Sequence, residues 1–162
     1  MKRITVILIT ICLLTLSCKS SPNADTVAFR LLGLYDKIPP CSQFVKNGEE
    51  GEYGYISSSD FTFLYTGVRE ELPEWELIQD FRIILSDTES PFELHVIRVY
   101  SSSDVEEIAK LLNKRADLIR YHNKTEESYH VYDPRVFIRG RYAILAVTED
   151  NEAIKLMLDK IL

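Results

Sequence analysis

Residues 92–115 read FELHVIRVYSSSDVEEIAKLLNKR, a stretch whose first half has the character of a strand and whose second half that of a helix. Apolar residues that occupy both faces of the first half are Leu94, Val96, Ile97 and Val99. This pattern is typical of an interior strand that is covered on each side. We therefore predict a strand over residues 92–100, with a second strand over residues 77–85 before it.

The second half of this stretch predicts the best-defined helix of the chain. Ser103 and Glu106 have the spacing of a capping box, in which the serine caps the helix and the glutamate bonds back to it. Acidic residues lie in the first turn and basic residues in the last, which matches the helix dipole. We expect this helix to run from Asp104 to about residue 121, with one apolar stripe toward the sheet.

Outward from this block, the sequence predicts further helices and strands. Further helices are expected over residues 26–37, over residues 61–66 and from near Glu149 or Asp150 onward. A hairpin is expected over residues 136–147, with Gly140 at its tight turn. Residues 41–53 predict a polar loop, and residues 53–56 a short strand or extended piece. The predicted fold class is α+β: a single domain with a roughly four-stranded antiparallel sheet packed against helices.

The chain begins with a pattern typical of an export signal. Residues 1–18, MKRITVILITICLLTLSC, contain two cations, an apolar run from Ile4 to Leu16, and the small residue Ser17 before Cys18. An apolar run of about 13 residues spans roughly 20 Å as a helix, short of the ~30 Å of a bilayer core. We therefore predict that residues 1–17 are a cleaved signal peptide and that the rest of the chain is extracytoplasmic.

A cysteine at the cleavage point is typical of bacterial lipoproteins, in which the thiol receives a diacylglyceryl group. Ser17 is the small residue that this pattern prefers, whereas Thr15 stands where leucine is preferred. Two or more acyl chains hold a protein stably on a membrane, so acylation of Cys18 predicts attachment to the cell membrane without a transmembrane helix. The alternative is ordinary secretion, with cleavage near Ser20 or Ala24.

The sequence after the signal predicts a short flexible tether over residues 18–23 and a single domain over residues 24–162. Cleavage removes Lys2 and Arg3 from the 19 Lys and Arg residues and none of the 25 acidic ones, which leaves a net charge of −8. This charge argues against a nucleic-acid partner, because phosphates require a basic surface. The expected partners are the membrane, through the lipid on Cys18, and an unidentified envelope protein or ligand.

Local motifs for catalysis and cofactor binding are absent from the sequence. We therefore predict no catalytic residue, no metal site and no cofactor. If the protein is an enzyme, His122, His130 and Asp133 are its candidate catalytic residues. The two histidines could also meet around a metal with Glu126 and Glu127, but a solvated loop is the simpler interpretation.

Other residues that could mark a functional surface are better explained by the core. His95 falls in the predicted interior strand and is interpreted as a strand-face residue. Cys41 is the cysteine that remains after cleavage and acylation, and it is interpreted as a small buried hydrophobe. Phe61, Phe63 and Trp75 belong to an aromatic cluster that could meet a partner, but we expect these three to complete the core.

Three segments carry a resemblance to a known family: residues 64–68 (LYTGV), residues 92–120 with their strand and capped helix, and residues 136–147 (VFIRGRYAILAV). In this order they resemble a family of uncharacterised bacterial membrane lipoproteins, known only as a domain of unknown function. The resemblance extends from about residue 24 to residue 162. It implies an α+β fold and a membrane location, and it implies no activity or catalytic residue.

These observations together favour a noncatalytic binding or interaction module that is anchored in the cell envelope. An envelope-associated enzyme with an unrecognised site is one alternative. A small solute-binding lipoprotein is the other, and it ranks lower because the chain is short for the two-lobed architecture usual in that class.

Overall fold

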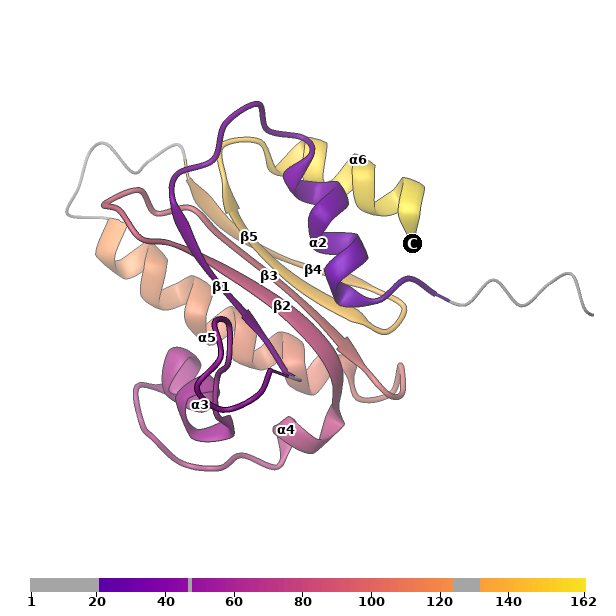
Figure 1. The fold of residues 1–162 in the computed structure, drawn as a ribbon. Coiled ribbons are helices and arrows are strands. Elements are labelled where there is room, and N and C mark those ends of the chain that lie inside the picture. Colours follow the sequence, from indigo (N-terminus) through magenta and orange to yellow (C-terminus); the bar gives the residue numbers. More distant parts are fainter. Residues whose placement is uncertain (1–20, 47, 124–131) are drawn as a thin grey trace, which may run out of the picture.

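The computed structural model describes residues 21–46, 48–123 and 132–162, and Figure 1 shows how their helices and strands are arranged. Within these residues there are five helices and five strands. The helices are α2 (Ala24–Leu32), α3 (Ser58–Thr66), α4 (Glu74–Leu77), α5 (Val105–Asn123) and α6 (Asn151–Ile161). The strands are β1 (Cys41–Val45), β2 (Ile78–Ser86), β3 (Glu93–Val99), β4 (Asp133–Arg139) and β5 (Tyr142–Thr148). The predicted α+β class is confirmed.

The five strands form one antiparallel sheet in the order β1-β2-β3-β5-β4. β3 lies at its centre, where Glu93 pairs with Leu85 of β2 on one side and with Val147 of β5 on the other. An interior strand was predicted here from the apolar residues on both faces, and this prediction is confirmed. At the opposite end of β3, Arg98 pairs with Asp80 and Tyr142.

The predicted number of four strands is wrong, because the edge strand β1 lies within residues 41–53, which were expected to form a polar loop. Its five residues, CSQFV, are too few to display a clear alternation of polar and apolar positions. Pairing with β2, far away in the sequence, gives this segment its strand conformation. Residues 53–56, expected to be extended, contribute only an isolated bridge between Val45 and Tyr55.

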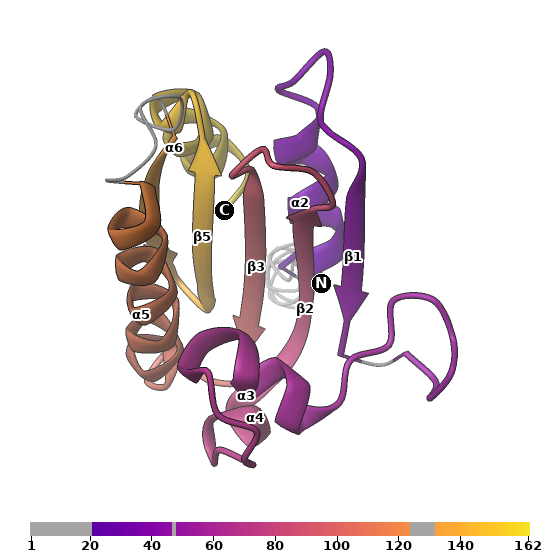
Figure 2. The ribbon, with the colours of Figure 1, turned by 90° about the vertical axis from the view of Figure 1, so that its left-hand side faces the viewer.

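Helices cover both faces of the sheet, which gives the body three layers. α3 and α5 lie on one face, and α2 and α6 lie on the other (Figures 1 and 2). Successive residues of a strand point to opposite faces, so β3 contributes to two separate cores. Ile97 and Val99 belong to the core beneath α5, whereas Leu94 and Val96 belong to the core beneath α2 and α6. His95 shares the α5 face with Ile97.

Several predicted helix boundaries differ from those of the structure: α2 begins at Ala24 and α3 at Ser58, two and three residues earlier than predicted. α5 begins at Val105, so Asp104 takes the position before the helix that was predicted for Ser103. The Ser103 hydroxyl instead donates a hydrogen bond to the Asp104 carboxylate at 2.9 Å. α2 ends at Leu32, although the apolar spacing predicted a helix to residue 37. Apolar spacing shows which face of a helix is buried but does not show where the helix ends.

The other helices and the hairpin begin and end at residues suited to those positions. The side chains of Asn23, Ser57 and Asp150 each accept a hydrogen bond from a backbone N–H in the first turn of α2, α3 and α6. Gly67 ends α3 in a left-handed conformation, with φ of 73°. Gly140 has φ of 56° at the turn between β4 and β5, which confirms the predicted hairpin.

Candidate functional site

Four polar side chains lie in the otherwise apolar core beneath α5. We call them the buried polar cluster: Tyr65 from α3, Glu93 and His95 from β3, and Arg115 from α5. Tyr65 and His95 are 1% and 0% exposed, whereas the side chains of Glu93 and Arg115 are 12% and 25% exposed. Glu93 and His95 point to the same face because they are two residues apart on one strand. The cluster therefore extends from the core beneath α5 toward solvent at Arg115.

Hydrogen bonds connect the four side chains in a continuous chain. The Tyr65 hydroxyl lies 2.8 Å from Nδ1 of His95, and Nε2 of His95 lies 3.1 Å from the Glu93 carboxylate. Arg115 donates to both oxygens of this carboxylate, at 3.1 and 2.5 Å. With Glu93 ionised and His95 neutral, Nε2 of His95 donates to the Glu93 carboxylate and Nδ1 accepts a hydrogen bond from the Tyr65 hydroxyl.

Burial and these hydrogen bonds set the protonation of the cluster. Burial lowers the pKa of His95 below its ordinary value, and the hydrogen bond to Glu93 opposes this effect without reversing it. Burial raises the pKa of Glu93, but the hydrogen bonds from His95 and Arg115 outweigh burial and leave this pKa below its ordinary value. Burial also raises the pKa of Tyr65 well above its usual range. At neutral pH, Glu93 and Arg115 therefore form the one ion pair of the cluster.

A pocket opens beside the more exposed end of this cluster. It has a volume of about 440 Å³ and lies between α3, the segment before it, the β1–β2 edge of the sheet and α5. Its lining is mainly apolar and aromatic, with three charged residues: Phe44, Tyr55, Ile56, Asp60, Phe63, Leu64, Arg69, Leu85 and Arg115. We call it the rim pocket. Its size and its mixture of apolar walls with few polar groups are usual for ligand sites.

The two arginines of the rim pocket are held differently. Arg115 is fixed by its two bonds to the Glu93 carboxylate, which is almost completely buried. Arg69 forms an ion pair with Asp60 at 3.1 Å, in which both side chains are largely exposed. The Arg69 guanidinium also lies 5.4 Å from the ring centroid of Phe63. The pocket thus presents one guanidinium anchored in its inner wall and a second one at its outer edge.

The aromatic residues expected in the core divide between core and pocket. Phe61 is 1% exposed, as predicted, and Trp75 is partly buried. Phe63 is 48% exposed and lines the rim pocket, so its assignment to the core is wrong. A helix of nine residues turns only part of its surface to the sheet, and Phe63 lies on the other part.

The residues that matter in the buried polar cluster were largely missed by sequence reasoning. His95 is a strand-face residue, as interpreted, but both its ring nitrogens have hydrogen-bond partners. A carboxylate and an imidazole at alternate positions of an apolar strand were a usable signal, because buried polar groups require partners. Tyr65 and Arg115 come from distant elements, and nothing in their local sequence indicates this role.

The candidate catalytic residues are only partly described by the structure. His122 lies exposed in the last turn of α5, and Asp133 lies exposed at the start of β4. Asp133 forms an ion pair with Arg135 at 2.9 Å. No group of three or more His, Cys, Asp or Glu side chains within the described ranges could hold a metal ion. Candidates that lie outside those ranges are Glu126, Glu127 and His130.

The predicted processing residues, Ser17 and Cys18, also lie outside the described residues, and their roles stay predictions. Cys41 is a half-buried free thiol that donates to the backbone oxygen of Pro39 at 3.1 Å. Burial raises the pKa of this thiol, and the nearby Asp87 carboxylate raises it further. Both effects disfavour the reactive thiolate form of Cys41.

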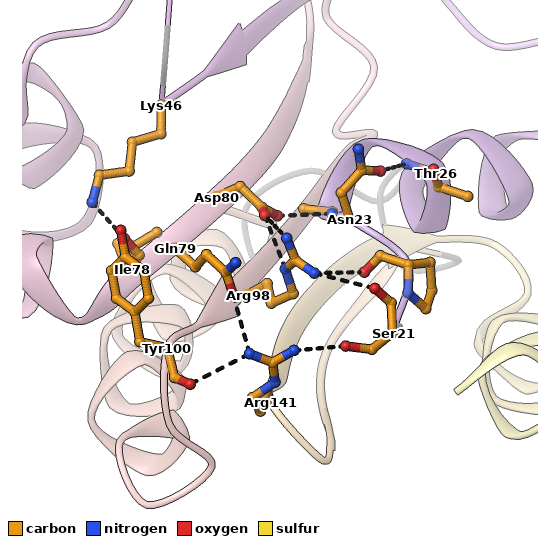
Figure 3. A network of polar contacts seen from close by, with 12 residues as sticks. Ser21, Asn23, Thr26, Lys46, Ile78, Gln79, Asp80, Arg98, Tyr100 and Arg141 are labelled. Carbon is orange, nitrogen blue, oxygen red and sulfur yellow. Dashed lines mark hydrogen bonds and ion pairs between the residues drawn. The ribbon is translucent and has the colours of Figure 1, made fainter. Parts of the chain in front are cut away.

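Two arginines hold the first described residues of the chain against one end of the sheet (Figure 3). Arg98 donates from Nη1 to the backbone oxygens of Ser21 and Pro22, at 3.2 and 3.1 Å. Arg141 donates from Nη2 to the Ser21 hydroxyl at 2.6 Å, and the Tyr142 hydroxyl donates to the Pro22 oxygen. We call these contacts the N-terminal clamp.

Neighbouring groups position the two arginines of the clamp. The Asp80 carboxylate accepts from Nε of Arg98 at 2.9 Å, and its other oxygen accepts from the backbone N–H of Ala24 at 2.8 Å. Arg141 donates from Nη1 to the side-chain oxygen of Gln79 at 3.1 Å (Figure 3). The clamp therefore connects the start of α2 with strands β2, β3 and β5.

The N-terminal clamp includes residues that were predicted to belong to the flexible tether over residues 18–23. Ser21 and Pro22 are bound by the clamp, and the Asn23 side chain accepts from the N–H of Thr26 at 2.8 Å. The last three residues of the predicted tether thus make defined contacts with the domain. The first three, residues 18–20, lie outside the described part of the chain.

None of the helices in the described ranges has both the length and the apolar character needed to span a membrane. Comparisons of the chain with protein-family models, with curated proteins and with solved structures found no match.

Proposed function

We propose that this protein is a binding module, attached by a lipid on Cys18 to the extracytoplasmic face of a bacterial cell membrane. The location rests on the sequence of residues 1–18 and on the resemblance to a lipoprotein family, for which no family model gave a match. The observation that carries the binding role is the rim pocket, which combines apolar walls with the anchored guanidinium of Arg115.

The buried polar cluster supports a binding role better than a catalytic one. A general base must reach the proton that it removes from a substrate. His95 is fully buried, and its two nitrogens already contact Tyr65 and Glu93. The cluster instead fixes the position of Arg115, because an arginine bound at two nitrogens to a nearly buried carboxylate has little freedom to turn.

The lining of the rim pocket indicates the chemistry of its ligand. An arginine side chain has five N–H donors, and the two bonds to Glu93 leave donors of Arg115 for a ligand oxygen. The walls made by Phe44, Phe63 and Leu85 suit an apolar or aromatic group. We therefore propose that the pocket binds an apolar or aromatic group with a carbonyl or carboxylate oxygen, presented by an envelope protein.

The membrane location is tested by replacing Cys18 with alanine. The protein should then leave the membrane fraction and appear in the soluble extracytoplasmic fraction or the medium. Ser20→Ala, which leaves the acylated position intact, serves as the control and should stay in the membrane fraction. Retention of the Cys18→Ala protein in the membrane would refute the lipid anchor.

The binding role is tested with a photo-crosslinking residue in place of Phe63, in cells that express the full chain. Leu156, which is 70% exposed on α6, provides the control position away from the pocket. A specific adduct should form from position 63, and Arg69→Glu should weaken it. Arg135→Glu, at another exposed ion pair, should leave the adduct unchanged. Equal adducts from both positions, or insensitivity to Arg69→Glu, would contradict the proposal.

A further inference from the structure

The N-terminal clamp leaves a very short connection between the domain and the predicted lipid. Only three backbone steps separate Cys18 from Ser21, which is bound by Arg98 and Arg141. An extended chain advances at most about 3.6 Å per residue, so Ser21 lies within about 11 Å of Cys18. A tether that ended only at residue 23 would instead let the domain rotate freely on the membrane.

We infer that the end of the domain that carries the clamp lies against the membrane surface and faces the phospholipid headgroups. This inference rests on the proposed acylation of Cys18. Acyl chains on Cys18 enter the bilayer there, so the clamp must lie at the level of the headgroups. Figure 1 shows that the start of α2, the β4–β5 turn and the end of α6 all lie at this end of the body.

The side chains at this end suit contact with headgroups. A shallow cavity of about 420 Å³ is lined there by Ser21, Pro22, the four residues 139–142 and the last two residues of the chain. Arg141 and Arg139, the latter ion-paired with Asp159 at 2.8 Å, line it, and guanidinium groups bind phosphate oxygens well. Tyr100, whose backbone oxygen accepts from Arg141 at 3.4 Å, is 60% exposed. Tyrosine is enriched at membrane–water interfaces because it combines an apolar ring with a polar tip.

This orientation would keep the rim pocket available to a partner. Arg98 lies at the clamp end of β3, and Glu93 lies five residues away at the other end, roughly 17 Å along the strand. Leu85, which pairs with Glu93, lines the rim pocket together with Arg115. The pocket wall thus lies toward the end of the sheet that points away from the proposed membrane contact.

The orientation is tested with the acylated full-length protein, purified from membranes and reconstituted in phosphatidylglycerol–phosphatidylcholine vesicles. In a Cys41→Ser background, a fluorophore is placed by Ser102→Cys near the clamp or by Glu89→Cys in the β2–β3 turn. Both positions are exposed, and they lie at opposite ends of the sheet. A lipid with a spin label on its headgroup should quench the fluorophore at position 102 at least about twice as strongly as the fluorophore at position 89. The reason is that about 20 Å separates the two ends of the sheet.

A second variant separates the clamp from the anchor. Ten Gly and Ser residues inserted between Ser20 and Ser21 add a coil with a mean span of roughly 16–19 Å. The inserted protein should still sediment with vesicles, and its quenching ratio should fall to about one. Equal quenching at 102 and 89 in the parent protein, or a ratio that the insertion leaves unchanged, would overturn the inferred orientation alone. A protein that carries no lipid and stays in the supernatant would refute the anchor itself, and the orientation with it.

Discussion

Replacement of Arg115 by methionine tests whether the buried polar cluster depends on its ion pair. The substitution keeps much of the apolar stem but removes both donors to the Glu93 carboxylate, at 3.1 and 2.5 Å. Glu93 would then remain a charged carboxylate on a side chain that is only 12% exposed, with His95 as its remaining partner. Breaking a buried pair in this way costs about 3–5 kcal/mol. Because Arg115 itself is 25% exposed and water can enter its place, we expect about 3 kcal/mol, the lower end of that range.

The loss of stability in Arg115→Met should arise from the unpaired charge of Glu93, and a double substitution removes that charge as well. In Glu93→Leu/Arg115→Met neither charge remains, and the main penalty is the unpaired Nε2 donor of His95, about 1–3 kcal/mol. The double variant should therefore be more stable than Arg115→Met alone. Arg135→Met provides the control, since its pair with Asp133 is half-exposed and contributes about 0–1 kcal/mol.

The assay is urea unfolding of residues 19–162, produced without lipid and followed by tryptophan fluorescence and circular dichroism. The free energy of unfolding is compared among the four proteins only if it depends on urea concentration with the same slope in each. A changed slope indicates a changed unfolded or folded state. A loss of stability within about 0.5 kcal/mol for Arg115→Met, the range of ordinary surface substitutions, would show that the buried cluster does not depend on this ion pair. A double variant less stable than the single one would show that the unpaired charge is not the source of the cost.

Four further predictions concern protonation and local structure. Because burial lowers the pKa of His95, the unfolded chain binds a proton below pH 6.5 that the folded protein does not, so the free energy of unfolding should fall with falling pH. The free energy of unfolding should change with pH by up to about 1.4 kcal/mol per pH unit, and Glu93 should add to this dependence below its unfolded pKa. Urea unfolding between pH 7 and 5 measures the dependence, and His95→Gln should make it weaker. Gly67→Ala should lower the free energy of unfolding by about 1 kcal/mol, because a β-carbon disfavours φ of 73°. An unchanged melting temperature would contradict this prediction. Asp150→Ala should cost about 1 kcal/mol by loss of the α6 cap, with Asp150→Asn as the conservative variant that retains most of it. Cys41 should react with a disulfide reagent at pH 8 more slowly than free cysteine, and a faster reaction would contradict its raised pKa.

The elements predicted best from the sequence are those whose pattern is local and repeated. The interior strand β3 shows apolar residues on both faces, and the hairpin of β4 and β5 has glycine at its turn. In each case a few neighbouring residues already determine the backbone conformation, so the local sequence is sufficient.

The elements that were missed depend on residues far apart in the sequence. β1 becomes a strand through its pairing with β2, and its five residues carry little signal of their own. The rim pocket exists because α3, β1, β2 and α5 meet, and its Arg115 is held by Glu93 from a distant strand. Likewise, residues 18–23 predict a flexible tether from their own sequence, and contacts with the distant Arg98, Arg141 and Tyr142 give Ser21 and Pro22 fixed positions.

The N-terminal clamp also has a consequence for the order of folding. The contacts from Ser21 to Arg141 and from Pro22 to Tyr142 each span 120 residues. Contacts between such distant residues form late, because closure of a long loop costs conformational entropy before any contact is gained. The hairpin that provides Arg141 and Tyr142 must therefore be synthesised before the N-terminal clamp on residues 21 and 22 is complete. If Cys18 is processed as we propose, the enzymes that cleave and acylate the chain should find this segment unbound in the newly exported protein. The same segment would be held by all of its clamp contacts only once the hairpin has joined the sheet.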